Sequence, residues 1–323
     1  MNRRLIWLLA TASCLWACGP DADQPAERLT IPPGANFTAV TDTLLAHGLV
    51  RHRRWFTLVA RVRGLDRAVQ AGTYDIQPGS SASHILTMLA EGREAMERIT
   101  IREGLTTLDL AAIMGDRLAL SAEEFSDAAR DTLLVRRYSP TATSLEGYLF
   151  PETYTLPAGV EAARVVTLMA EEFERHWRPE WNSRLDTLGW SRDQVLALAS
   201  IVEGEAQVGS ERATISGVYH NRLRLGMRLQ ADPTVQYAIQ QATGQRKPRL
   251  LLRDYEIPSP YNTYLIDGLP PGPVSSPGLP SIEAALYPAD VPWLYFVADS
   301  TGHHVFTRTY GEHLETIRRL RGQ

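Results

Sequence analysis

The sequence predicts an α+β fold with two parts, a small N-terminal module and a larger, mainly helical C-terminal domain. Three times within residues 29–118 a short β-prone run is followed by a turn and an amphipathic helix. After residue 141 helical periodicity dominates, and only one pair of strands is expected. A chain of 323 residues is long enough for about two domains with hydrophobic cores. We place the boundary in "YSPTATS" (138–144), which separates a module at 29–140 from a domain at 141–323.

Composition argues against a nucleic-acid partner. The net charge is −4 and 44% of the residues are apolar, as in an ordinary globular protein. Basic residues are scattered, and the only dense group is "RHRRW" at 51–55. We interpret this group as a solvated helix face, which is the usual role of a short charge run. No nucleic acid is therefore expected among the partners.

The first residues have the pattern of an export signal. Arg3 and Arg4 precede an apolar stretch at 5–16 that is too short to span a bilayer comfortably. The stretch "LWACG" resembles a bacterial lipobox, in which Cys18 is lipidated after cleavage. A plain signal peptide and an uncleaved anchor are the alternatives. All three place the body outside the cytoplasm, and we expect a protein anchored in the inner (cytoplasmic) membrane that faces the periplasm or extracytoplasmic space.

Both cysteines, Cys14 and Cys18, lie in the segment 1–18, and a polar linker at 19–28 follows it. The rest of the chain can have neither an internal disulfide nor a cysteine metal site. Its stability must come from packing.

Three strand–turn–helix units, at 29–49, 72–92 and 97–118, are expected in the N-terminal module. Their connections are too short for repeated parallel crossovers, which favours a small α+β module over a parallel sheet. The pattern is similar to LysM-type modules, which bind glycans that contain N-acetylglucosamine. The alternative is a purely structural spacer between the anchor and the larger domain. Polar helices are expected at 119–140.

In the C-terminal domain, helical periodicity predicts four helices, which are followed by a long Pro/Gly-rich loop, two strands and a closing helix. The helices are expected at 159–178, at 191–206, at 211–225 and from Pro233; the loop is expected at 256–280, a buried strand at 293–299 and a second strand at 303–309.

The helix at 191–206 carries two glutamates, in "LASIVEGEAQVG" (198–209). Ser191 and Gln194 predict a capping box at its start. Glu203 and Glu205 differ by about 200° around the axis, so they cannot act as an acid and a base on one face. Glu205 falls on the more apolar stripe (Leu198, Ile201 and Val202), and Glu203 lies beside Leu196, Ala199 and Ser200. Burial without a cation raises the pKa of a carboxyl, as a general acid requires; the alternative is a solvated carboxylate at a frayed helix end.

Two further carboxylates are candidates for chemistry. Asp232 precedes Pro233, the usual signature of an N-cap followed by N1, and we favour a structural cap over a catalytic role. Glu146 and Tyr148 lie in "SLEGYLFPETY", an aromatic segment punctuated by glycine and proline. This composition is typical of sugar-binding loops, although aromatic residues at such spacing are more often part of a core.

Polar residues on the next helix and in the long loop are candidates for glycan binding. Asn221, Arg222 and Gln230 carry groups that suit N-acetyl, hydroxyl and carboxylate recognition. Arg222 or Arg228 could meet carboxylates of a ligand, with a solvated helix face as the alternative. A long loop in a compact domain is commonly functional, and it supplies four more candidates for a substrate cleft: Tyr261, Asn262, Thr263 and Tyr264.

No metal and no cofactor are expected. His303 and His304 are adjacent on a predicted strand, so they should face opposite sides, and no third ligand has suitable spacing.

Several long motifs occur in the order typical of one known family. "LEGYLFPETY", "ASIVEGEA", "ERATISGVYHNRLRLGMRLQADPTVQYAI", "SPYNTYLIDGLPPGPVSSPGLPSIEAALYP" and "LYFVADSTGHHVF" resemble motifs of the YceG-like (MltG) family of endolytic murein transglycosylases. The resemblance is dense over 145–315 and loose over 29–118. It implies a lysozyme-like catalytic domain in which the second glutamate of the E-x-E pair, Glu205 here, is catalytic. The family usually has Thr or another small residue after this glutamate, and Ala206 lacks the hydroxyl that a Thr would offer to the glutamate or the substrate.

The resemblance and the residues together lead to one functional hypothesis. We expect a lytic transglycosylase that cleaves the MurNAc–GlcNAc bond within nascent peptidoglycan strands and leaves 1,6-anhydroMurNAc ends. A single Glu would act as acid and then as base. A non-catalytic murein-binding scaffold and a hydrolytic muramidase are the alternatives. Endolytic cleavage, and work beside peptidoglycan synthases, are implied by the resemblance alone.

Overall fold

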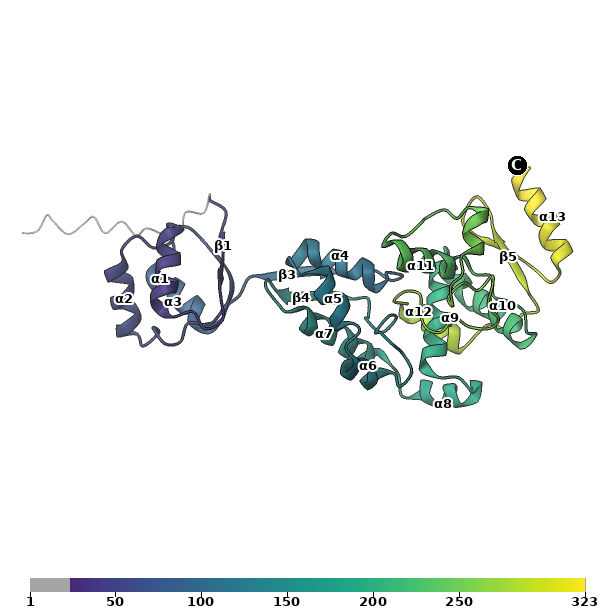
Figure 1. The fold of residues 1–323 in the computed structure, drawn as a ribbon, viewed down its shortest axis with the longest axis horizontal. Coiled ribbons are helices and arrows are strands. Elements are labelled where there is room, and N and C mark those ends of the chain that lie inside the picture. Colours follow the sequence, from purple (N-terminus) through teal and green to yellow (C-terminus); the bar gives the residue numbers. More distant parts are fainter. Residues whose placement is uncertain (1–23, 323) are drawn as a thin grey trace, which may run out of the picture. The chain divides into compact units, whose positions relative to one another are not determined.

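A computed structural model describes residues 24–322, in which the chain forms two units (Figure 1). One unit runs up to Glu97 and includes Thr155–Gly159; the other contains Arg98–Tyr154 and the chain from Val160 onward. The expected α+β class is confirmed, because helices are combined with three two-stranded sheets in the described part. The export signal with Cys18 lies outside the described residues. Within 24–322 no helix is both long and apolar enough to span a bilayer.

The first unit is built on the antiparallel strands β1 (Glu27–Ile31) and β2 (Gly72–Ile76), in which Leu29 lies opposite Tyr74. The helices that pack with this pair are α1 (Phe37–Ala46), α2 (Arg53–Val62) and α3 (Ala82–Glu91). Asn36 caps α1 and Ser81 caps α3 by accepting backbone N–H groups. The core combines both strands and all three helices and includes Leu29, Val40, Leu44, Phe56, Tyr74 and Ile85.

The chain passes from one unit to the other within β3 (Met96–Thr100) and again within β4 (Thr153–Pro157), and these two strands pair with each other. The division therefore falls at Glu97, earlier than the boundary expected at 138–144. The physical reason is packing within the second unit: α4 (Thr107–Leu118) contacts α5 (Ala122–Ala128), which in turn contacts α7 (Ala162–His176). The third strand–turn–helix unit exists as expected, but its helix belongs to the second unit.

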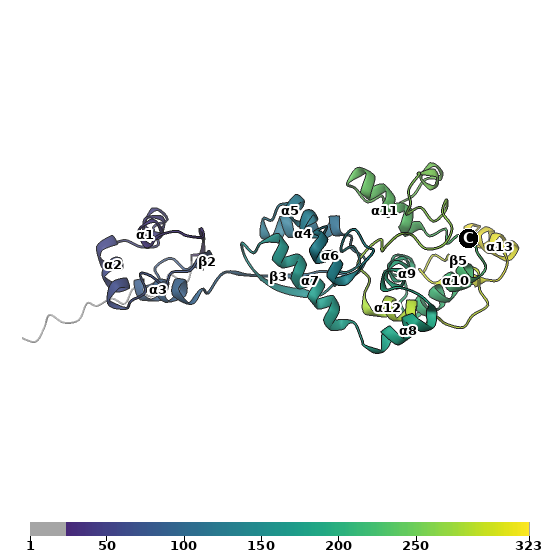
Figure 2. The same ribbon diagram turned by 60° about the horizontal axis from the view of Figure 1, so that its bottom comes forward.

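Helix α9 (Arg192–Glu205) is at the centre of the second unit, in contact with α10, α11 and α12 (Figures 1 and 2). Ser191 and Gln194 form the predicted capping box. Each residue from Val195 to Val202 is buried, so α9 is enclosed on all sides. The remaining elements of this unit are α6 (Thr132–Tyr138), α8 (Glu180–Leu188), η1 (Gly209–Glu211), α10 (Arg212–Arg224), α11 (Asp232–Thr243), η2 (Leu252–Glu256), α12 (Leu279–Leu286), β5 (Tyr295–Ala298), β6 (His304–Thr307) and α13 (Tyr310–Arg321).

Two expectations for this unit need correction. The helix expected at 159–178 ends at His176, and α8 follows separately, with Pro179 as its N-cap. The strand expected to be buried at 293–299 is the shorter β5, whose residues are all half-buried because it pairs only with β6.

Candidate active site

The candidate active site lies where the C-terminal end of α9 meets the start of α11. Gly204 makes this close approach possible: a Cβ atom there would lie 2.6 Å from Cγ of Pro233. Contacts this short do not occur between real side chains, so glycine is required between the two glutamates. As a result, the backbone N–H of Asp232 donates a hydrogen bond to Glu205, the last residue of α9.

Glu205 is half-buried, and its Oε1 accepts a hydrogen bond from the Tyr219 hydroxyl at 3.0 Å. Burial and then the negative charge of Asp232 raise the pKa of Glu205 to about 7, although the hydrogen bonds and Arg222 favour the charged form. The partial negative charge at the C-terminal end of a helix acts in the same direction as burial. A carboxyl with this pKa carries its proton for much of the time at neutral pH, as a general acid must.

Asp232 is not the helix cap that we favoured from the sequence. It is the first residue of α11, and the N-cap is Ala231, whose side chain cannot bind a helix N–H group. The carboxylate of Asp232 instead accepts hydrogen bonds from the hydroxyl groups of Tyr264 at 2.7 Å and Tyr255 at 3.4 Å. The rings of these tyrosines lie 4.4 Å apart between centroids. We call the five residues Glu205, Asp232, Tyr219, Tyr255 and Tyr264 the Glu205 cluster; all but Tyr219 are half-buried and reach the surface.

Asn262 and Thr263 hold this cluster in place from within. Both are fully buried, so the expectation that they line a substrate cleft is wrong. The Asn262 amide donates to the carbonyls of Tyr255 and Ile257 and accepts the N–H of Tyr264. The Thr263 hydroxyl accepts the N–H of Ala231 at 3.0 Å. These bonds satisfy the backbone of an irregular loop, which explains why buried polar residues occur there.

Asn221 and Arg222 likewise bind backbone. The Asn221 amide donates to the carbonyls of Val291 and Trp293. The Arg222 guanidinium donates to the carbonyls of Leu294 and Leu229, at 2.7 and 2.6 Å. Both residues are 8% exposed and fix the segment that leads into β5, so only the charge of Arg222 acts on Glu205.

Gln230 is exposed two residues before Asp232, in the left-handed conformation with φ 50°. Such a conformation is uncommon for a residue other than glycine and often marks a functional position. Its role in binding stays a prediction. Arg228, which we considered for the carboxylates of a ligand, pairs with Asp267 at 3.0 Å.

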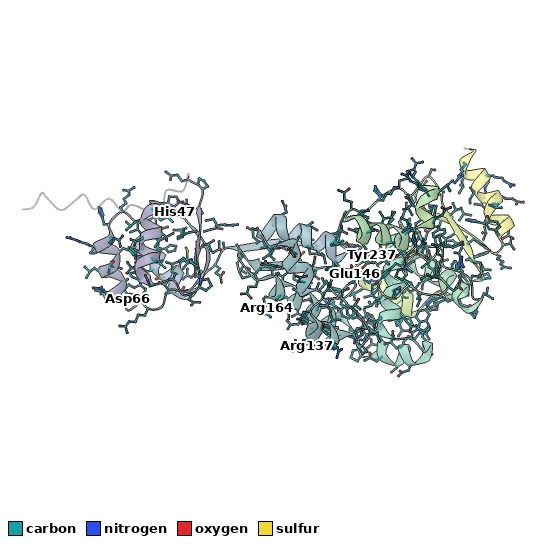
Figure 3. All side chains as sticks on the ribbon, viewed as in Figure 1. His47, Asp66, Arg137, Glu146, Arg164 and Tyr237 are labelled. Carbon is teal, nitrogen blue, oxygen red and sulfur yellow. The ribbon has the colours of Figure 1, made fainter. Side chains whose placement is uncertain are left out.

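Glu146 forms a second buried carboxyl site, next to Tyr237 (Figure 3). It accepts the N–H of Thr107, the first residue of α4, at 3.1 Å. Burial raises the pKa of Glu146 to about 7. Tyr261, a predicted binding residue, lies against Tyr237 with ring centroids 4.8 Å apart. Across residues 24–322, neither a hydrogen bond nor an ion pair joins Glu146 to Glu205.

Tyr148 does not belong to a binding surface, contrary to the expectation. It is fully buried, its hydroxyl donates to Asp193, and its ring packs against Phe173. At Tyr148 the aromatic segment at 144–154 is therefore part of the hydrophobic core, and this ring cannot stack on a sugar.

The stripe argument that separated the two glutamates is also wrong, because α9 is buried on every side. Glu203 is in fact well enclosed: its side chain is 7% exposed, pairs with Arg212 at 3.0 Å and accepts the N–H of Gly278. What distinguishes Glu205 is its partners, since within the described chain it forms no ion pair and is bound only by uncharged donors.

His303 and His304 do not face opposite sides as expected. His303 lies in the turn before β6, so both Nδ1 atoms reach the carboxylate of Glu211, at 3.2 and 2.7 Å. No group of three or more His, Cys, Asp or Glu residues suited to a metal ion is present between residues 24 and 322.

Sequence reasoning missed Tyr219 and Tyr255. Tyr219 precedes Arg222 by three residues on one helix, and residues at this spacing share a face. A search around the candidate Arg222 could therefore have found it. Tyr255 lies in η2, and nothing near it in the sequence indicates its contact with Asp232.

Glu205 is a half-buried carboxyl of near-neutral pKa in a polar cluster that reaches the surface. This combination defines the class of the protein as an acid–base enzyme. The chain belongs to the YceG-like family, whose profile matches residues 29–319. An endolytic murein transglycosylase of Bacillus subtilis is 32% identical over 302 residues, which cover 88% of this chain and 82% of that protein. A protein of the same description from Streptococcus pneumoniae is 31% identical over 304 residues, 85% of this chain and 55% of its own length. The crystal structure of a YceG-like protein from Listeria monocytogenes aligns with a TM-score of 0.63 and 30% identity, over 90% of this chain and 99% of that one.

Proposed function

We propose that this protein is a lytic transglycosylase that cleaves the glycan strands of peptidoglycan between MurNAc and GlcNAc. The relatives from Bacillus and Streptococcus, both described as endolytic murein transglycosylases, support this activity and an endolytic mode. The observation that carries the proposal is Glu205, a carboxyl whose pKa is raised to about 7 and which faces a polar cluster at the protein surface.

In the proposed reaction, protonated Glu205 donates its proton to the glycosidic oxygen as the bond to C1 of MurNAc breaks. The resulting carboxylate then accepts the proton of the C6 hydroxyl of the same sugar, and the C6 oxygen bonds to C1. The products are a 1,6-anhydroMurNAc end and a free GlcNAc hydroxyl, and Glu205 regains its proton. One carboxyl serves both steps, and water is not consumed.

The neighbours of Glu205 have distinct parts in this proposal. The Tyr219 hydroxyl orients the carboxyl, since it donates a hydrogen bond to Oε1 of Glu205. Asp232 keeps the proton on Glu205 in the resting enzyme and places a negative charge near the positive charge that develops at C1. Tyr255 and Tyr264 fix the orientation of Asp232 and present ring faces to the sugar.

Asp232 also favours a second candidate, a hydrolytic muramidase. Hydrolases of glycosides normally use two carboxylates, and Asp232 interacts electrostatically with Glu205. A hydrolase would leave reducing MurNAc ends, so the products distinguish the two mechanisms.

For the whole chain we infer an exported protein whose N-terminal segment, through Cys18 or an uncleaved helix, tethers it to the membrane. The first unit is proposed to be LysM-like and to bind glycan, and the second unit to carry catalysis. Work beside peptidoglycan synthases fits the proposed substrate, a nascent strand.

Digestion of purified peptidoglycan, followed by mass spectrometry, tests the proposed activity. We expect wild type to release soluble muropeptides and Glu205→Gln to release none above background. Glu146→Gln is the matched control, because it makes the same change in a carboxyl of similar pKa and should retain activity. Release by Glu205→Gln equal to wild type would contradict the assignment, and no release by folded wild type would favour the scaffold alternative.

A further inference from the structure

Helix α2 presents an apolar stripe to solvent. Trp55, Leu58 and Val62 are 61%, 52% and 78% exposed. They follow the i, i+3, i+7 spacing that places side chains on one helix face. Phe56 and Ala60, on the other side of α2, are fully buried in the core of the first unit. Phe56 and Ala60 therefore attach α2 to the core of the first unit, and the residues of the outer stripe do not belong to that core.

The charged residues of α2 itself have one sign. The sequence of α2 contains no acidic residue. Arg54 and Arg61 border the stripe on the helix surface, and Arg51 precedes the helix. Across residues 24–322, these three arginines form neither an ion pair nor a side-chain hydrogen bond. Other arginines of the same region do have partners: Arg53 pairs with Asp42, and Arg63 binds Ser83 and Thr87 of α3.

The N-terminal segment leads to this same surface. A hollow in the first unit is lined by Trp55, Arg51 and Gln24, the first described residue. The carbonyl of Gln24 accepts a hydrogen bond from the Gln77 amide at 2.5 Å, which fixes where the chain arrives. Cys18 precedes Gln24 by six residues, which span at most about 20 Å. A membrane anchor at or before Cys18 therefore places the stripe close to the bilayer.

We propose that α2 binds an anionic lipid surface, with Trp55, Leu58 and Val62 among the headgroups and Arg51, Arg54 and Arg61 paired with lipid phosphates. A helix with apolar and aromatic residues on one face and arginines beside them is suited to the membrane interface. An indole ring also stacks on sugars, but the exposed aliphatic side chains of Leu58 and Val62 beside it fit the apolar part of a membrane interface better than the polar surface of a glycan. The proposal uses the inferred anchor for location and is independent of Glu205.

Vesicle cosedimentation tests this proposal with a chain of residues 19–323, which keeps every described helix and strand and lacks the signal segment. Vesicles of equal parts phosphatidylcholine and phosphatidylglycerol are compared with phosphatidylcholine alone, at low and high salt. We expect wild type to bind the mixed vesicles and to be released by salt. Arg54→Gln with Arg61→Gln should lower the partition coefficient by about fivefold for each arginine. Trp55→Ala with Leu58→Ser should lower it on mixed vesicles by at least the same factor.

Leu133→Ser provides a matched control, because Leu133 is 81% exposed on α6 in the other unit and should not affect binding. Glu205→Gln should bind vesicles like wild type, so loss of catalysis and loss of membrane binding can be told apart. Circular dichroism melts check that each variant is folded. The proposal is overturned if wild type ignores the mixed vesicles, or if the α2 variants bind them unchanged. Weaker binding of the Trp55 variant to purified sacculi, with vesicle binding intact, would assign the stripe to glycan instead.

Discussion

Glu205 and Glu146 occupy two regions of the second unit that share a raised pKa but differ in their access to the surface. Burial raises the pKa of both carboxyls to about 7. Glu205 ends α9, is half-buried and belongs to a cluster that reaches the surface. Glu146 is 4% exposed and accepts the first N–H of α4.

This difference teaches that a raised pKa does not by itself identify a catalytic acid. A general acid must also come within hydrogen-bonding distance of the substrate. Glu146 is enclosed by the start of α4 and by Tyr237, so its proton has no route to a sugar. Glu205 combines the same pKa with access, and the predictions below test this contrast.

The largest effect is expected for Glu205→Gln, which keeps the size of the side chain and removes the transferable proton. General acid–base assistance is typically worth about 10²- to 10⁴-fold in rate. We expect turnover of glycan strands to fall by at least that range, with a melting temperature equal to or slightly above that of wild type. More than a tenth of wild-type turnover in the variant would remove the distinction between the two carboxyls.

A smaller effect, and a shift in pH dependence, are expected for Tyr219→Phe. The hydroxyl stabilises the charged form of Glu205, so its loss should raise the pKa of Glu205 further. The alkaline limb of the kcat/KM profile, where the acid loses its proton, should move to higher pH, and kcat should fall several-fold. Tyr237→Phe is the matched control, because that hydroxyl bonds Glu146. Identical pH profiles for wild type and Tyr219→Phe would exclude Glu205 as the titrating acid.

Glu203→Gln should affect stability more than activity. The change removes the 3.0 Å ion pair with Arg212 and leaves this mostly buried cation with the longer contact to the carboxylate of Glu103, at 3.8 Å. We expect the free energy of unfolding to fall by about 1.5 to 3 kcal/mol, the usual contribution of a hydrogen bond to a charged group. Most of the activity should remain while the protein is folded. A loss as large as that of Glu205→Gln in folded protein would contradict the assignment of roles on α9.

The smallest effect on activity, within about twofold by the argument from access, is expected for Glu146→Gln. Its signature is in stability. The pKa of Glu146 is raised from 4.5 to about 7, so between these values the native state holds a proton that the unfolded chain has released. Wild-type stability therefore declines with rising pH across this window. Denaturant unfolding should show the variant gaining on wild type between pH 5 and pH 8, by up to about 3 kcal/mol. A difference that does not change with pH would mean that Glu146 does not titrate there.

Local signals in the sequence were sufficient for much of the fold. The three strand–turn–helix units, the capping box at Ser191 and the extent of α9 follow from caps, turns and apolar periodicity. The boundary between units does not, because it depends on which distant helices pack together. The face of Glu205 could not be derived either, since a helix buried on every side has no stripe that separates inside from outside.

The candidate site was only partly predictable from the sequence, because it also depends on contacts between distant segments. The contact between Gly204 and Pro233 joins segments far apart in the chain, and so does the bond between Asp232 and Tyr264. The local motif "DP" predicts a helix cap and gives no information about a distant partner such as Tyr264. The roles of Asn221 and Asn262 could not be predicted either. Nothing in a short motif reveals whether an amide side chain binds a sugar or the protein's own backbone.

Product analysis in water enriched in ¹⁸O tests the central claim most directly. Wild-type protein is incubated with purified uncrosslinked glycan strands, and the new ends are identified by mass spectrometry. If Glu205 alone serves as acid and then base, every new MurNAc end should be 1,6-anhydroMurNAc without ¹⁸O, because the C6 oxygen of the sugar itself closes on C1. Reducing MurNAc ends that carry ¹⁸O would show that water is the nucleophile, and would return Asp232 to consideration as the missing base.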